Sequence, residues 1–431
     1  MKKSLVLYRN VPCETLFHQM QWLIGIVQNR EDYDEEYAED VYYDCIHELI
    51  ELSGEYGLEG NLWHAYLAFV LANAENAFST GCEITGPQEG SVNWMARHDF
   101  AVLKELYDFD LGKLDRMFGT CMGDVLKNYH NGGHTTKVFN KRVRDRICEL
   151  AELLAKADTI DAFYDCVADF YREFGVGTFG LHKAFRIEHD EKDKAVLVPI
   201  TCIQHTSLSD LVGYEIQKKK LVENTKNFVE GRPANNCLLF GDSGTGKSSC
   251  IKAILNEYYD RGLRMIEIYK HQFQDLSAVV SQIKNRNYRF IIYMDDLSFE
   301  EFEIEYKYLK AVIEGGLERR PDNVLIYATS NRRHLIRESF DDTKDYNHEL
   351  HSSDTVQEKL SLAARFGVTI YFGAPGKMEF NTIVRELAKK AGIQMSEEQL
   401  LAEANKWELS HGGMSGRTAA QFITYLKGQE R

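Results

Sequence analysis

The segment that most constrains the fold is residues 237–250, where CLLFGDSGTGKSSC runs from four apolar residues directly into a glycine-rich loop. The loop fits the pattern G-x-x-x-x-G-K-[ST], with Gly241, Gly246, Lys247 and Ser248 at the defining positions. Glycines let successive backbone N–H groups converge on one point and form a nest for an anion. An apolar strand that passes through such a loop into a helix predicts an α/β fold with a phosphate-binding site.

The polar residues of this loop each have an expected task at a nucleotide. Lys247 would place a positive charge between the β- and γ-phosphates, and the Ser248 hydroxyl is a hard oxygen ligand suited to Mg²⁺. The alternative is a glycine-rich turn of an unrelated fold. We expect nucleotide binding by the whole loop, which comprises Gly241, Asp242, Ser243, Gly244, Thr245, Gly246, Lys247, Ser248 and Ser249.

The length and composition of the chain limit the classes of protein to which it can belong. A chain of 431 residues is long enough for two or three domains. Its net charge of −15 disfavours bulk attraction to nucleic acid or to anionic membranes, although a local basic patch stays open. The nine cysteines include no Cys-x-x-Cys pair, so neither a disulfide framework nor a zinc site is indicated. No stretch approaches the roughly 20 apolar residues of a membrane span, and the N-terminal apolar run is too short for a signal peptide. We therefore expect a cytoplasmic protein without a membrane partner.

The first part of the chain, residues 1–175, shows helix-period patterns with few turn signals and predicts a helical N-terminal domain. Within it, residues 31–60 carry twelve acids and no Lys or Arg. This segment is either a solvated helix face or a docking surface for a basic partner. The basic run Lys141, Arg142, Arg144 and Arg146 is either a polar helix face or the complement of that surface in another subunit.

The rest of the chain predicts a linker, a sheet and a C-terminal helical region. Residues 176–206 indicate a short β linker with two strands, of which the second contains Pro199 and is disfavoured as a central strand. From residue 207 to 376, apolar runs alternate with helical segments and predict a five-stranded parallel sheet covered on both faces. Residues 377–431 predict a small helical lid. The five apolar runs are 237–240, 265–269, 290–294, 324–328 and 368–372.

Acidic and amide side chains follow two of these apolar runs. Asp295 and Asp296 come directly after FIIYM, at the edge of the sheet where open α/β proteins bind ligands. We expect Asp295 to act through Mg²⁺ and Asp296 to orient an attacking water; the alternative is a plain strand-to-turn Asp-Asp pair. Asn331 follows the run 324–328 and would face the γ-phosphate if its strand lies between the other two. A turn-forming Asn at a strand end explains Asn331 equally well.

Five motifs in this order and spacing resemble the AAA+ ATPases: GDSGTGKS, YMDDLSFEE, IYATSNRRHLI, EKLSLAARFG and MSGRTAAQF. Within that class they resemble most closely an uncharacterised bacterial family with a DDLSFE-type Walker B and an ATSNRRHL-type sensor 1 strand. The resemblance covers roughly residues 205–431. It implies a sheet in the order 5-1-4-3-2, a helical lid, and ATP bound at the interface between subunits of an oligomer.

The resemblance also implies roles for individual residues. Asn331 resembles sensor 1, Arg417 the sensor 2 arginine of the lid, and Arg365 the arginine finger that reaches a neighbour's γ-phosphate. Gly213 and Tyr214 resemble the N-linker that packs on adenine. For each arginine the alternative is a surface charge or a structural ion pair, and the rival positions for the finger are Arg332 and Arg333.

Two positions depart from the common AAA+ pattern. The second Walker B acid is Asp296 rather than Glu, so hydrolysis is expected to be slow or to need help from Glu300 or Glu301. Ala363 and Ala364 precede Arg365, where the resembling family tends to have polar or acidic residues.

The expected function is that of an AAA+ ATPase, which binds and hydrolyses Mg-ATP to remodel or load a macromolecular partner, either protein or nucleic acid. Self-association is expected, and the helical N-terminal domain would select the partner. One alternative is an ATP-dependent binding switch with little turnover, which Asp296 and the acidic segment 31–60 motivate. Another is a P-loop kinase for a small molecule, which leaves Arg365 and Arg417 without a task.

Overall fold

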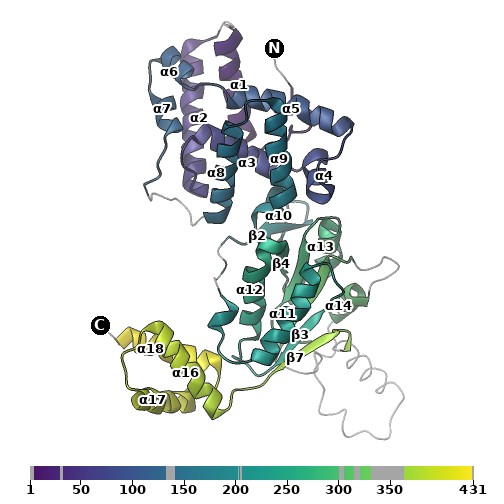
Figure 1. The fold of residues 1–431 in the computed structure, drawn as a ribbon, viewed down its shortest axis with the longest axis vertical. Coiled ribbons are helices and arrows are strands. Elements are labelled where there is room, and N and C mark those ends of the chain that lie inside the picture. Colours follow the sequence, from purple (N-terminus) through teal and green to yellow (C-terminus); the bar gives the residue numbers. More distant parts are fainter. Residues whose placement is uncertain are drawn as a thin grey trace. The chain divides into compact units, whose positions relative to one another are not determined.

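The chain divides into two compact units, which Figure 1 shows as a helical part and an α/β part. The structure is a computed structural model that describes residues 4–29, 33–132, 141–201, 203, 206–299, 305–314, 321–331 and 364–429. The N-terminal unit comprises Met1–His182 and Pro199–Cys202, and the C-terminal unit comprises Lys183–Val198 and Ile203–Arg431.

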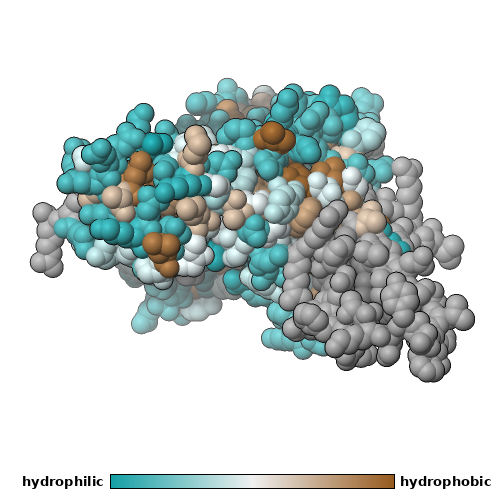
Figure 2. All heavy atoms as spheres, turned by 90° about the horizontal axis from the view of Figure 1, so that it is seen from below, coloured by the Kyte–Doolittle hydropathy of each residue, from teal (hydrophilic) through white to brown (hydrophobic). Residues whose placement is uncertain are grey.

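The described surface is mostly hydrophilic on the face seen in Figure 2, where hydrophobic residues form small separate groups. Single hydrophobic side chains such as Met378 and Leu409 are strongly exposed. Among the described helices, none combines the length and the apolar content that a membrane span requires.

The N-terminal unit is built around α3 (Leu62–Asn73), whose residues are apolar and buried on nearly all sides. Neighbouring helices, among them α2, α5 and α8, pack against it, which explains why α3 lacks a polar face. Buried hydroxyls join distant parts of this core, because Tyr171 donates to the Leu71 carbonyl at 2.8 Å and lies 3.0 Å from the Tyr8 hydroxyl. The other helices of this unit are α1 (Glu14–Asn29), α2 (Glu35–Tyr56), α4 (Ala77–Thr85), α5 (Ser91–Tyr107), α6 (Gly112–Phe118), α7 (Met122–Lys127), α8 (Lys141–Ala155), α9 (Ile160–Phe174) and α10 (Gly177–Leu181).

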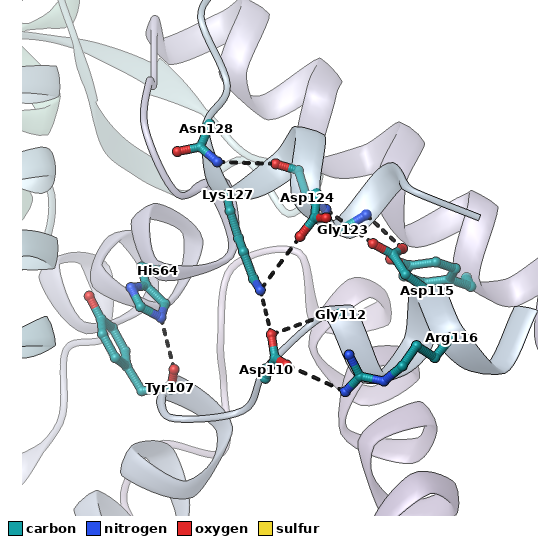
Figure 3. Close-up of polar contacts among 11 residues, drawn as sticks. His64, Tyr107, Asp110, Gly112, Asp115, Arg116, Gly123, Asp124, Lys127 and Asn128 are labelled. Carbon is teal, nitrogen blue, oxygen red and sulfur yellow. Dashed lines mark hydrogen bonds and ion pairs between the residues drawn. The ribbon is translucent and has the colours of Figure 1, made fainter. Parts of the chain in front are cut away.

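The corner between α6 and α7 contains a cluster of charged side chains (Figure 3). Asp115 accepts hydrogen bonds from the backbone N–H groups of Gly123 and Asp124, at 2.8 and 3.1 Å, and so caps the start of α7. Lys127 lies between two carboxylates, where it bonds Asp110 and lies 3.8 Å from Asp124. Because these charges pair with one another, we interpret the cluster as a structural one that stabilises the connection between α6 and α7.

The C-terminal unit contains a seven-stranded sheet in the order β2-β1-β4-β5-β6-β3-β7. The pairs β1–β4, β4–β5, β5–β6, β6–β3 and β3–β7 are parallel. The carboxyl ends of β3, β5 and β6 therefore lie side by side at one edge. The strands are β1 (Ala184–His189), β2 (Ala195–Pro199), β3 (Cys237–Gly241), β4 (Leu263–Glu267), β5 (Arg289–Met294), β6 (Val324–Ser330) and β7 (Val368–Phe372).

The prediction of a five-stranded sheet is wrong, because β1 and β2 extend it to seven strands. The sequence of residues 176–206 predicts a β linker, yet β1 pairs with β4 in the register Ala184↔Met265 and buries Phe185 and Ile187. Pro199 ends the edge strand β2, where its missing N–H breaks no interior ladder. The five predicted runs fall at β3 to β7, which lie in the order β7-β3-β6-β5-β4.

Helices connect the strands and complete the unit. The C-terminal helices α16, α17 and α18 pack together around Phe380, Ala404 and Phe422. The helices are α11 (Glu215–Val229), α12 (Lys247–Tyr258), α13 (Leu276–Ile283), α14 (Glu305–Glu314), α16 (Lys377–Ala391), α17 (Glu397–Ser410) and α18 (Gly416–Gln429), with the 3₁₀ turns η1 (Leu208–Asp210), η2 (Tyr259–Arg261) and η3 (Lys270–Asp275).

Candidate functional site

The glycine-rich loop connects β3 to α12 and needs its glycines for steric reasons. Gly241, Gly244 and Gly246 have φ values of 131°, 75° and 92°, which L-residues with a side chain rarely adopt. A Cβ atom at Gly241 would lie 2.1 Å from the Phe372 carbonyl oxygen on the paired strand β7. The loop therefore holds its shape only with glycine at this position.

Lys247, the first residue of α12, is folded back over this loop. Its Nζ donates to the carbonyl oxygens of Gly241 and Asp242 at 2.9 and 2.7 Å, and to Asn331 Oδ1 at 3.0 Å. Burial lowers the pKa of Lys247, although neighbouring carboxylates, with Asp242 first, act in the opposite direction. A buried ammonium with only neutral hydrogen-bond acceptors is well suited to bind an anionic ligand.

Ser248, Asp295 and Thr329 join three elements at the edge of the sheet. The Ser248 and Thr329 hydroxyls both donate to Asp295 Oδ1, at 2.6 and 2.5 Å. Desolvation acts to raise the pKa of Asp295, but these hydroxyl bonds outweigh it and the pKa lies below its usual value. Asp295 therefore presents an anionic carboxylate at neutral pH.

Asp296 and Asn331 form a second pair beside the first. Asn331 Nδ2 donates to Asp296 Oδ1 at 2.7 Å, and the Asp296 backbone N–H donates to Thr329 Oγ1 at 2.9 Å. Asp296 has a φ of 50°, a left-handed conformation that non-glycine residues seldom adopt. The two adjacent carboxylates have different partners, since Asp295 accepts from Ser248 and Thr329 and Asp296 accepts from Asn331.

These side chains line a cavity of about 610 Å³. Its polar lining includes loop residues 243–249, Asp295, Asp296 and Asn331, and its apolar lining includes Leu211, Val212, Tyr214, Ile383, Leu387 and Ala420. A lining of both kinds suits a nucleotide, which joins a charged phosphate chain to a largely apolar base.

Arg417 and Tyr214 also line the cavity. The Arg417 backbone N–H donates to the Gly244 carbonyl at 3.1 Å, so the start of α18 lies against the loop. Tyr214 donates through its hydroxyl to the Gly373 carbonyl at 2.8 Å, and its burial raises its pKa to about 12. Gly213, at a φ of 83°, precedes Tyr214 and is not among the lining residues.

Other predicted positions lie elsewhere. Arg365 is described, just before β7, and is not among the residues that line the cavity. The remaining candidates, Arg332, Arg333, Glu300 and Glu301, lie outside the described residues, as does most of the motif EKLSLAARFG.

Sequence reasoning missed Thr329 and the helical part of the apolar wall. Thr329 holds both the Asp295 carboxylate and the Asp296 N–H, and its signal was its place two residues before Asn331 on the same strand. Ile383, Leu387 and Ala420 come from α16 and α18 and carry no local pattern that separates wall residues from core residues.

The oxygen donors fit Mg²⁺. The Ser248 hydroxyl lies 2.6 Å from the Asp295 carboxylate, and Mg²⁺ prefers few protein oxygen ligands supplemented by phosphate and water. Within the described ranges, no group of three or more His, Cys, Asp or Glu side chains could hold a metal ion by itself. The residues therefore fit Mg²⁺ bound together with a phosphate ligand.

A family model described as "Protein of unknown function (DUF815)" matches residues 181–430. The replication factor C large subunit of Staphylothermus marinus is 30% identical over 76 residues, which are 17% of each chain. Among solved structures, the RuvB Holliday junction branch migration motor of Thermotoga maritima is 15% identical, with a TM-score of 0.36 over 51% of this chain and 63% of that chain. The FIGL-1 AAA domain in complex with ADP is 17% identical, with a TM-score of 0.36 over 52% of this chain and 73% of that chain. The chain thus spans less than two thirds of the RuvB chain and a small part of the replication subunit.

Proposed function

The chain belongs to the DUF815 family, whose description assigns no function, and from the site itself we propose that it is an AAA+ ATPase using Mg-ATP. One observation carries the proposal: Lys247, the Ser248–Asp295 pair and the Asp296–Asn331 pair meet around a glycine loop at the start of α12. This set contains the groups that phosphate binding, metal binding and water activation each require.

The loop and α12 are proposed to hold the phosphates. Backbone N–H groups of the loop and the positive end of the α12 dipole attract the anion. Lys247 would exchange its carbonyl acceptors for phosphate oxygens. Ser248 and Asp295 would hold Mg²⁺. The metal would supply positive charge that offsets the negative charge of the transferred phosphoryl group.

Asp296 is proposed as the group that orients the attacking water and accepts its proton. Asn331 holds one carboxylate oxygen of Asp296 at 2.7 Å, which leaves Oδ2 to face a water. Because the same Asn331 also contacts Lys247 at 3.0 Å, it can couple the water-binding group to the phosphate-binding group.

We also propose roles for the two arginines and the helical lid. Arg417 lines the cavity and its backbone N–H donates to the loop, which supports a role in sensing the γ-phosphate from α18. Arg365 is not in the wall of its own cavity, which agrees with a finger that acts on a neighbouring subunit. The order β7-β3-β6-β5-β4 supports the AAA+ arrangement of the five core strands.

The N-terminal unit is proposed to select a macromolecular partner in the cytoplasm. Residues 1–182 carry 30 Asp and Glu against 16 Lys and Arg, whereas the rest of the chain carries 36 against 35. This concentration of negative charge favours a protein partner with a basic surface over nucleic acid at this unit.

ATP hydrolysis measured across a range of protein concentrations tests the proposal, with Lys247→Ala and Arg365→Ala alongside. Specific activity that rises with concentration and is lost in both variants supports an assembly-dependent ATPase. Tight ATP binding with negligible turnover would instead favour a binding switch. The bond from Asn331 to Asp296 motivates that second candidate, because it restrains the shorter Walker B acid. Absence of ATP binding would reject both.

A further inference from the structure

Tyr293 is a buried polar residue beside Ser248 and Asp295, the residues proposed to bind Mg²⁺. Tyr293 lies on β5 two residues before Asp295, so the two side chains leave the chain on the same face. The Tyr293 side chain is 1% exposed, and its hydroxyl has no hydrogen-bond partner among the described residues. Burial raises the pKa of Tyr293, and the nearby Asp295 carboxylate raises it further, whereas the Ser248 hydroxyl acts in the opposite direction.

A neighbouring tyrosine shows how such a hydroxyl is normally accommodated. Tyr327 on β6 is also fully buried, but its hydroxyl accepts from Asn224 Nδ2 at 2.9 Å and bonds Thr225 Oγ1 at 2.9 Å. A buried hydroxyl without a partner costs free energy that a phenylalanine at the same place would avoid. The Tyr293 hydroxyl is therefore explained best by a partner that it gains in another state of the site.

The carboxylate of Asp295 offers that partner. Ser248 and Thr329 both donate to Oδ1, and among the described residues no donor reaches Oδ2. A carboxylate held on one oxygen can still rotate about its terminal torsion. A donor from a third direction would fix its plane, in the way that outer groups orient the ligands of metal sites.

We infer that Tyr293 is a positioning residue for Mg²⁺, whose hydroxyl donates to the Asp295 carboxylate when Ser248 and Asp295 hold the metal. This inference rests on the proposed Mg-ATP site and deepens it. The hydroxyl lies close to this carboxylate without a well-aligned hydrogen bond. A closer approach when the metal binds would make its contribution to Mg²⁺ binding larger than its contribution to folding.

The test compares Tyr293→Phe with the matched control Tyr327→Phe. For each protein, the Mg²⁺ concentration for half-maximal binding of a fluorescent ATP analogue is measured, together with binding in EDTA and the nucleotide-free melting temperature. We expect Tyr293→Phe to need about tenfold more Mg²⁺, to bind the analogue normally in EDTA, and to melt at or above the wild-type temperature. Tyr327→Phe should melt lower and keep the wild-type Mg²⁺ dependence.

The outcomes separate this inference from the proposed function. Wild-type protein that binds no analogue in either condition rejects the nucleotide site, and the inference with it. If wild type binds but Tyr293→Phe keeps the same Mg²⁺ dependence, only the inference is overturned. The same holds if Tyr293→Phe melts below wild type or loses analogue binding in EDTA, because either result assigns the hydroxyl to folding or to nucleotide contact.

Discussion

At the scale of single residues, Asp296 and Lys247 are proposed to have separable tasks, because they would contact different parts of the proposed ligand. We expect Asp296→Asn to keep Mg-ATP binding within about threefold and to lower hydrolysis about 10²- to 10³-fold, since an amide cannot accept the proton of the attacking water. Lys247→Ala should lose binding itself. Phosphate release and titration with a fluorescent nucleotide measure the two effects.

Asp242→Asn provides the control for Asp296→Asn. Asp242 belongs to the same loop, but its carboxylate accepts from the Ala374 N–H at 2.7 Å, and Asp242 is not among the residues that line the cavity. Its hydrolysis should stay within a few-fold of wild type. Wild-type turnover in Asp296→Asn would show that another group activates the water.

At the scale of elements, Asp99 on α5 fixes the N-terminal segment of the helical unit. The buried carboxylate accepts from the N–H groups of Val6, Leu7 and Tyr8 at 2.7–3.1 Å. We expect Asp99→Ala to lower the free energy of unfolding of this unit by about 1–3 kcal/mol, because three backbone donors, of which that of Tyr8 is buried, lose their acceptor. Urea denaturation followed by tryptophan fluorescence measures it, since Trp22, Trp63 and Trp94 report from this unit.

The matched control lies at the end of the same helix. Asp108 follows α5 and pairs with Lys104 at 2.8 Å in an exposed position, so Asp108→Ala should cost no more than about 0.5 kcal/mol. Equal effects of the two substitutions would contradict the role given to the Asp99 carboxylate.

Local sequence patterns predict where strands form better than they predict which strands pair with one another. The apolar runs of β3, β5 and β6 are continuous and end in polar residues, so both the strands and the candidate site residues Asp295, Asp296 and Asn331 could be named in advance. The local pattern of β1 and β2 predicts only a linker, because the strand that pairs with β1, β4, lies far along the chain. Thr329 and Tyr293 were missed for the same reason, since their importance depends on contacts across strands.

At the scale of the whole molecule, the open question is whether one subunit completes the site of another. Lys247→Ala and Arg365→Ala should each be inactive alone, but their mixture should recover activity if Arg365 acts across an interface. In a head-to-tail assembly of equal amounts, an intact loop faces an intact finger at roughly a quarter of the interfaces. We therefore expect about a quarter of wild-type hydrolysis per subunit after mixing and exchange of subunits.

The stoichiometry of the mixture makes this prediction specific. Recovery should peak near equal amounts and fall toward zero at either extreme, because each active interface needs one subunit of each kind. A finger acting within its own subunit leaves every site in the mixture defective and gives no recovery. In that case Arg332→Ala replaces Arg365→Ala in the same experiment, since Arg332 directly follows Asn331 in the sequence. If activity recovers when Lys247→Ala is mixed with Arg332→Ala but not with Arg365→Ala, the arginine finger is Arg332 and the site is still shared between subunits.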